Sequence, residues 1–108
     1  MFTYFKPCCF LPAFPPTFEK HPLRSKIKAS INGNATITCK PEGAPEPVIT
    51  WFKNGNLLSG DGNRIIKLPN GNLVVRGVQV SDQGRYTCKA ENEFGVAQSS
   101  TSLTTAGQ

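Results

Sequence analysis

The sequence contains few of the residues from which catalytic and metal sites are built. Its 108 residues include one histidine, His21, and none of the spaced motifs of serine hydrolases, zinc proteases, phosphate loops or dinucleotide-binding domains. His21 lies beside Pro22, and we expect an ordinary surface or strand-edge histidine there. No apolar run approaches the roughly 20 residues that a membrane-spanning helix needs. We therefore predict that the protein has no enzymatic activity and holds no metal or cofactor.

Signals for strands and turns run through the chain from residue 17 onward. Hydrophobic residues make up 38% of the sequence, too many for a disordered chain, and 10 glycines and 9 prolines are typical of short strands joined by turns. Residues 78–84 favour a short helical turn. The expected strands are 17–21, 25–29, 35–40, 48–53, 56–58, 64–68, 72–76, 84–91 and 96–104. This pattern predicts an all-β fold, an antiparallel two-sheet sandwich.

The first fifteen residues differ from the rest of the chain. They are aromatic, are interrupted by prolines and show no regular period. We expect residues 1–15 to form an atypical, disordered leader, residues 16–105 to form the domain and residues 106–108 to form a tail. Cys8 and Cys9 could carry palmitate, but no transmembrane or amphipathic segment accompanies them, so we assign them no role.

Positive charge is concentrated in one stretch. The net charge is +5, from 12 basic and 7 acidic residues, and residues 20–40 contain five basic side chains and no acidic one. A solvated, charged strand edge is the favoured interpretation. The alternative is a heparan sulfate site formed by Lys20, Arg24, Lys26 and Lys28. No aromatic residues alternate with these cations to stack on bases, so we predict no nucleic-acid binding.

Two of the four cysteines are candidates for a long-range disulfide. Cys39 and Cys88 each lie in a stretch of alternating β-branched residues, and no cysteine or histidine spacing suggests zinc. In the loop-entropy model, closing a loop of this length contributes roughly 4 kcal/mol. Such a bridge would place the chain in an oxidising compartment.

The spacing of these residues resembles a known family. Cys39, Trp51 and the run Asp82-x-Gly84-x-Tyr86-x-Cys88 resemble the framework of an immunoglobulin domain. The I-set subtype is suggested by two further stretches, Gly43-x-Pro45-x-Pro47-x-x-x-Trp51-x-Lys53-Asn54-Gly55 and Ala90-x-Asn92-x-x-Gly95. The resemblance covers residues 16–105 and is closest to modules of neural cell-adhesion molecules of the contactin type.

The resemblance implies structural roles for the motif residues. Cys39 and Cys88 would bridge the two sheets with Trp51 packed beside them, and the Tyr86 hydroxyl would bond to the backbone of the preceding corner. Asp82 would need a partner when sheltered from water, and Arg64 is the candidate for that salt bridge. Leu73 would supply a core position, and Gly84 would allow a tight approach of the chain.

The family also implies a function. We expect a non-enzymatic protein-recognition module of a larger extracellular cell-adhesion or axon-guidance receptor attached to the membrane, with a homophilic or heterophilic cell-surface partner. Asn34-Ala35-Thr36 is an N-glycosylation sequon, which makes Asn34 a candidate glycosylation site. The alternative is an intracellular I-set scaffold or mechanical module of a giant muscle protein. A reduced Cys39 and Cys88 pair and an unmodified Asn34 would favour that alternative.

Overall fold

The computed structural model describes residues 12–106, which contain ten strands and one 3-10 turn. The strands are β1 (Phe14–Thr17), β2 (Lys26–Ser30), β3 (Asn34–Ile37), β4 (Glu42–Ala44), β5 (Val48–Lys53), β6 (Asn56–Leu57), β7 (Ile65–Lys67), β8 (Leu73–Arg76), β9 (Gly84–Asn92) and β10 (Gly95–Ala106). The 3-10 turn, η2, spans Val80–Asp82 and lies in the stretch predicted to form a short helical turn. The predicted all-β fold is confirmed. Residues 1–11, with Cys8 and Cys9, and residues 107–108 lie outside the described part of the chain.

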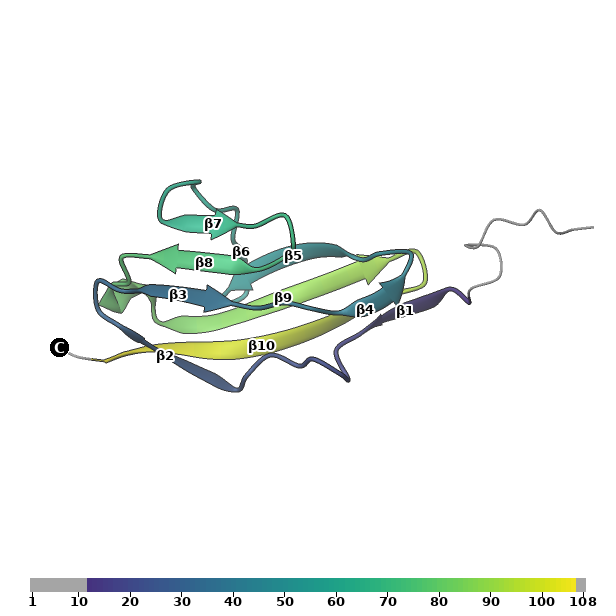
Figure 1. Ribbon diagram of the computed structural model, residues 1–108, viewed down its shortest axis with the longest axis horizontal. Helices are drawn as coiled ribbons and strands as arrows, with labels where there is room; N and C mark the ends of the chain where they lie inside the picture. The colour runs from purple at the N-terminus through teal and green to yellow at the C-terminus, as the bar shows by residue number, and fades with distance from the viewer. Residues whose placement is uncertain (1–11, 107–108) are drawn as a thin grey trace, which may run out of the picture.

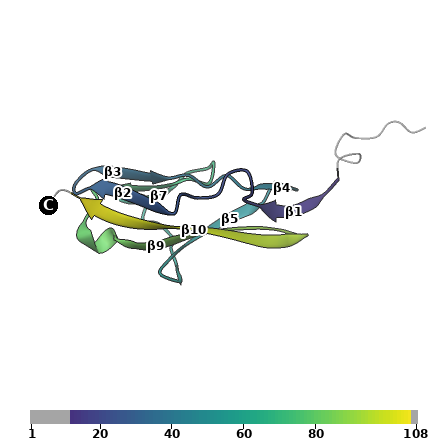
Figure 2. The ribbon, with the colours of Figure 1, turned by 90° about the horizontal axis from the view of Figure 1, so that it is seen from below.

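Two layers of strands form the sandwich, as Figure 2 shows with β3 and β7 in one layer and β9 and β10 in the other. One sheet has the order β2-β10-β9-β5-β6 and the other the order β3-β8-β7. Because side chains alternate across a strand, β9 sends Tyr86, Cys88 and Ala90 inward, where all three are buried. Burying a large apolar side chain is worth about 1.5–3 kcal/mol, so this interior supplies most of the stabilisation.

One pair of strands is parallel within the antiparallel two-sheet sandwich that was predicted. β2 pairs with β10 in parallel, from Lys26 opposite Ser102 to Ser30 opposite Ala106. The two strands come from opposite ends of the domain, so no short hairpin constrains their relative direction. The strand predicted at residues 25–29 is present as β2, with both ends shifted by one residue toward the C-terminus.

The predicted leader boundary is wrong at its last residues, because β1 begins at Phe14. β1 pairs antiparallel with β4, a strand that the sequence did not reveal, and Figure 1 shows the two side by side. The Asn92 amide Nδ2 donates to the carbonyl oxygens of Phe14 and Pro45, both at 3.0 Å. Proline has no backbone N–H to donate to a neighbouring strand. An edge strand tolerates it because the side of the strand that faces solvent needs no such donor. A strand was expected at residues 17–21, but β1 ends at Thr17 and residues 18–21 are not in a strand.

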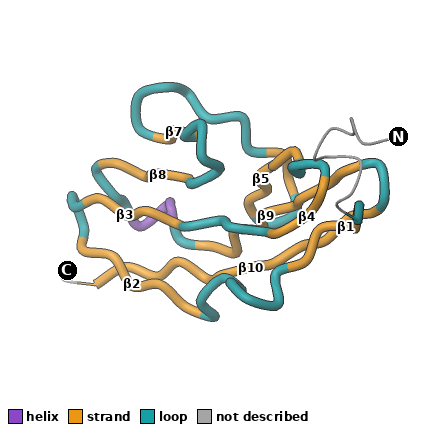
Figure 3. The backbone as a smooth tube through the Cα atoms, turned by 45° about the vertical axis from the view of Figure 1, so that its right-hand side comes forward, coloured by secondary structure: helices purple, strands orange, loops and turns teal. Residues whose placement is uncertain are grey.

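The segment between β1 and β2 runs along one open side of the sandwich. Figure 3 shows it as a loop beside β10. Its attachment includes the Leu23 amide, which donates to the Ser99 hydroxyl at 3.0 Å, and buried Phe18, which joins the core. Because this loop passes over the gap between β2 and β3, the gap becomes a surface cleft.

Candidate recognition surfaces

A disulfide and a tryptophan connect the two sheets. Cys39 and Cys88 are bonded, with their Cα atoms 6.4 Å apart. Trp51 lies directly opposite Cys88 in the β5–β9 register and is fully buried. Its indole Nε1 donates to the Gly71 carbonyl oxygen, 2.9 Å away, at the turn before β8. The side chain of one sheet is thereby hydrogen-bonded to the backbone that leads into the other, which holds the two layers in a fixed arrangement.

A buried polar corner closes the end of the sandwich near η2. Asp82 is 5% exposed, and its Oδ2 accepts from the Arg64 guanidinium at 2.5 Å and from the Gln79 amide at 2.7 Å. The Tyr86 hydroxyl donates to the Asp82 carbonyl oxygen at 2.6 Å. Burial, together with the Asp82 charge, raises the pKa of Tyr86 to about 12. The corner is satisfied internally and presents no reactive group.

The Gly84 position requires a residue without a side chain. A Cβ there would lie 2.8 Å from Oδ1 of Asn54, and this oxygen accepts a hydrogen bond from the Arg85 amide at 2.9 Å.

Leu73 is fully buried opposite Ile37 in the β3–β8 pair. The motif residues singled out in the sequence thus lie in the frame of the domain.

Within residues 12–106, no group of three or more histidine, cysteine, aspartate or glutamate side chains could hold a metal ion. No helix in this range is long and apolar enough to cross a membrane. Two surfaces of the described domain are candidates for binding.

The first surface is the outer face of the five-stranded sheet, called the outer face from here on. Val48 and Val96 both lie opposite Glu91 in the strand register, so the three side chains form one row across β5, β9 and β10. Val48 is 70% exposed, Val96 is 50% exposed and Leu57 on β6 is 64% exposed. An alternating strand normally points polar side chains to water, so the two exposed valines that flank Glu91 make this face a candidate contact surface.

Polar side chains lie around the exposed valines Val48 and Val96 of the outer face. Thr87 and Ser100 share a hydrogen bond of 2.8 Å, and Lys89 lies 4.0 Å from Glu91. Apolar groups flanked by hydroxyls and few charges are typical of protein–protein interfaces. Sequence alternation alone could have indicated which residues face outward, but the row itself depends on the register of three strands.

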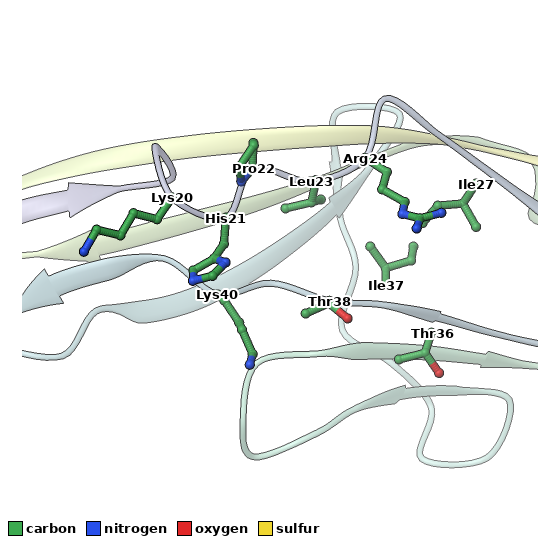
Figure 4. A pocket seen from close by; sticks show the side chains of 10 residues that line it. All are labelled: Lys20, His21, Pro22, Leu23, Arg24, Ile27, Thr36, Ile37, Thr38 and Lys40. Atoms are coloured by element: carbon green, nitrogen blue, oxygen red, sulfur yellow. The ribbon is translucent and has the colours of Figure 1, made fainter.

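The second surface is a cleft of about 460 Å³ between the β1–β2 loop and β3, called the basic cleft from here on. Figure 4 shows Lys20 and Arg24 toward its two ends, with His21 and Lys40 between them. The remaining lining residues are Pro22, Leu23, Ile27, Thr36, Ile37 and Thr38. Lys20 also lies 3.7 Å from Glu42, a weak contact between two largely solvated side chains.

The structure divides the basic stretch between two surfaces. Lys20 and Arg24 line the basic cleft. Lys26 and Lys28 are exposed on β2 and alternate with Ile27, a residue of the cleft, so they point to the outer face. Lys40 joins the cleft from the segment after β3 and was absent from the site predicted from the sequence. Its place depends on the packing of the loop against β3, which no local pattern encodes.

Asn34 lies at the start of β3 and is exposed. Its Oδ1 accepts from the Gly77 amide at 3.3 Å. Asn34 is therefore accessible at the surface, and Thr36, the third residue of the sequon, also lines the cleft described above.

Comparisons with known proteins agree with this architecture. The immunoglobulin I-set domain family matches residues 16–105. The chain is 45% identical over 84 residues to contactin of Drosophila melanogaster and 46% identical over 87 residues to contactin-1 of Gallus gallus. These matches cover 78% and 81% of this chain but only 6% and 8% of the relatives. The chain thus corresponds to a small part of each relative's length.

Solved structures share the fold. Extracellular domains 3–5 of Drosophila OTK align with a TM-score of 0.80 and 33% identity, over 88% of this chain and 33% of that one. One chain of a mutant titin M10–obscurin-like 1 complex aligns with a TM-score of 0.78 and 26% identity, over 88% of this chain and 96% of that one.

Proposed function

The chain belongs to the immunoglobulin I-set family, and we propose that it is a non-enzymatic recognition module of a larger cell-adhesion or axon-guidance receptor. Immunoglobulin domains of adhesion receptors bind protein partners, and this domain is similar to contactin modules. The observation that carries the proposal is the exposed row of Val48 and Val96 beside Glu91 on the outer face. A single face of this size gives modest affinity, which repeated modules in a longer receptor would increase by avidity.

Multivalent binding assays test the proposed function. The full chain would be coupled to fluorescent beads and mixed with beads carrying the same chain, and in parallel with neuronal cells before and after protease treatment. We expect bead clustering for a homophilic partner, or protease-sensitive cell binding for a heterophilic one. The variant V48Q/V96Q should reduce the bound signal at least about tenfold because it removes the apolar centre of the contact.

A matched control separates the outer face from general stickiness. Val80 is 62% exposed, but it lies on η2 and outside the outer face. V80Q should leave binding unchanged. Equal losses in V80Q and V48Q/V96Q, or no protein-dependent binding in either assay, would contradict the proposal.

The proposed location is the cell surface, as part of a membrane-attached protein. Support comes from the contactin relatives, from the Cys39–Cys88 bond and from the accessible sequon at Asn34. We propose that Asn34 carries an N-linked glycan. Intact-mass measurement of the secreted chain before and after glycosidase treatment would show the added mass, and N34Q would remove it.

The alternative function is an intracellular scaffold or mechanical module of a giant muscle protein. The alignment with a chain of the titin M10–obscurin-like 1 complex favours it. In native material this function would leave Cys39 and Cys88 reduced and Asn34 unmodified. Mass spectrometry of the native protein after alkylation of free thiols distinguishes the two functions.

Heparan sulfate is proposed as a second ligand class for the extracellular module. The sequence suggested Lys20, Arg24, Lys26 and Lys28 as its contacts, and the positive net charge supports it. Because the structure places these four residues on two surfaces, the binding site has to be argued from the geometry.

A further inference from the structure

We propose that the basic cleft binds a sulfated glycan chain, with Lys20, Arg24 and Lys40 pairing with its sulfate groups. The inference rests on the extracellular location proposed above, because sulfated glycans occur there. It uses a different surface from the outer face and does not depend on the protein partner. Lys26 and Lys28, although adjacent in sequence to Arg24, take no direct part in it.

The cations of the cleft come from two separate segments. Lys20 and Arg24 lie on the β1–β2 loop, and Lys40 lies just beyond β3 on the opposite wall. Figure 4 shows them spread along the cleft rather than gathered at one point. Glu42 near Lys20 is the one acidic group that an ion pair brings to these cations among the described residues. A linear ligand with repeated anionic groups can therefore contact several cations at once, whereas a single small anion cannot.

The walls and floor of the cleft suit a sugar chain. Thr36 and Thr38 bring hydroxyl side chains to the β3 wall. Leu23, Ile27 and Ile37 are partly or fully buried apolar residues along the same cleft. Sugar rings present hydroxyl edges and apolar C–H faces, so both kinds of surface would be used. Sites that combine apolar lining with a few placed polar groups are typical of small-ligand and glycan binding.

The outer face is the competing location for a polyanion. There Lys26 and Arg85 both lie opposite Ser102 in the strand register, so they flank it on neighbouring strands. Lys28 follows two residues after Lys26. Lys26, Lys28 and Arg85 lie on the exposed surface of a sheet, where their charges would attract anions mainly through solvent. The cleft is favoured because it partly encloses the ligand, which strengthens each charge contact.

A heparin octasaccharide is the probe for the test. Binding of the full chain would be measured by calorimetry at about 0.15 M salt, where the Debye length is about 8 Å. The cleft variant is K20Q/R24Q/K40Q, and the matched control is K26Q/K28Q/R85Q, which removes the same number of positive charges from the outer face. We expect the cleft variant to lose at least about tenfold in affinity and the control less than about threefold, since only the former loses direct contacts.

Two further ligands, desulfated heparin and an oligoglutamate peptide, test whether sulfate groups are required for binding. Fully desulfated heparin retains carboxylates and should bind at least about tenfold more weakly than heparin. Equal losses in both triple variants, or a larger loss in the control, would overturn the cleft site. Equally tight binding of an oligoglutamate peptide would overturn the sulfated glycan as ligand. If the cleft variant does not fold, the single variants R24Q and K40Q decide the matter, and each should lose more affinity than K26Q or K28Q.

The test is independent of the protein-recognition proposal. V48Q/V96Q leaves the charge unchanged and should bind the octasaccharide as the unmodified chain does. Loss of cell binding with retained heparin binding supports two separate surfaces. Retained cell binding would contradict the outer-face function without affecting the cleft, and lost heparin binding would contradict the cleft site.

Discussion

The corner around Asp82 and the edge formed by β1 and β4 are held in place in different ways. At the corner, a buried carboxylate is bonded to Arg64 and the Gln79 amide, while Tyr86 bonds to the Asp82 carbonyl oxygen. At the edge, the ladder between β1 and β4 is short and irregular, and the exposed Asn92 amide supports it. Specific side chains fix the corner, whereas long-range backbone pairing fixes the edge.

This difference has an energetic consequence. Removing one partner from a sheltered ionic group is costly because the other group stays buried and unpaired. Losing an exposed hydrogen bond is cheaper because water replaces the partner. The core and corner should therefore dominate the stability of the domain, and the β1–β4 edge should contribute a smaller, separable amount.

The largest effect is expected from removal of the disulfide that connects the two sheets. C39A/C88A should lower the free energy of unfolding by about 4 kcal/mol because the unfolded chain gains freedom. Urea denaturation of the full chain measures the loss. C8A/C9A is the control and should change the value by less than about 0.5 kcal/mol. A loss below about 1 kcal/mol in C39A/C88A would show that the bridge contributes little to the core.

Truncations should show an intermediate effect at the β1–β4 edge. Deleting residues 1–17 should cost about 1–2 kcal/mol because it removes β1, its pairing with β4 and the buried Pro16. Deleting residues 1–11 should cost less than about 0.5 kcal/mol, since we propose that these residues are not part of the domain. The two proteins would be compared by urea denaturation with the full chain. A loss above about 1 kcal/mol on deleting 1–11 would mean that the domain includes the leader.

The smallest effect concerns the tyrosine of the corner and depends on pH. Y86F should cost about 1 kcal/mol at neutral pH because it removes the hydrogen bond to Asp82. The pKa of Tyr86 is raised from 10.0 to about 12 in the folded domain. As pH rises from about 10 to 12, the unfolded tyrosine ionises before the folded one, so stability is lost with increasing pH.

Comparison of the unmodified chain with Y86F isolates that contribution, because other groups titrate equally in both. The difference in the free energy of unfolding between the two proteins should shrink from pH 9 to pH 11. A constant difference across that range would show that Tyr86 ionises as freely in the folded domain as in the unfolded chain.

Much of the frame was predictable from the sequence. The alternation of apolar residues gave strand 48–53, which matches β5, and the family resemblance placed Cys39, Trp51 and Cys88 together. Such positions can be predicted from the sequence because a buried sulfur, indole or carboxylate restricts which residue types can pack against it. β4 was missed because Glu42, Gly43 and Ala44 have weak strand propensity and form a strand only through pairing with β1.

The sequence by itself predicted the two-sheet sandwich, because side-chain alternation follows from local order along the chain, and its resemblance to the immunoglobulin family implied the core roles of the motif residues. Only the tertiary structure decided which surface residues became neighbours. It placed Val48 and Val96 on either side of Glu91. It placed Lys26 on a different surface from Lys20 and brought Lys40 to the basic cleft. The physical reason is that strand register and loop packing arise from contacts between segments far apart in the chain, which no local pattern specifies.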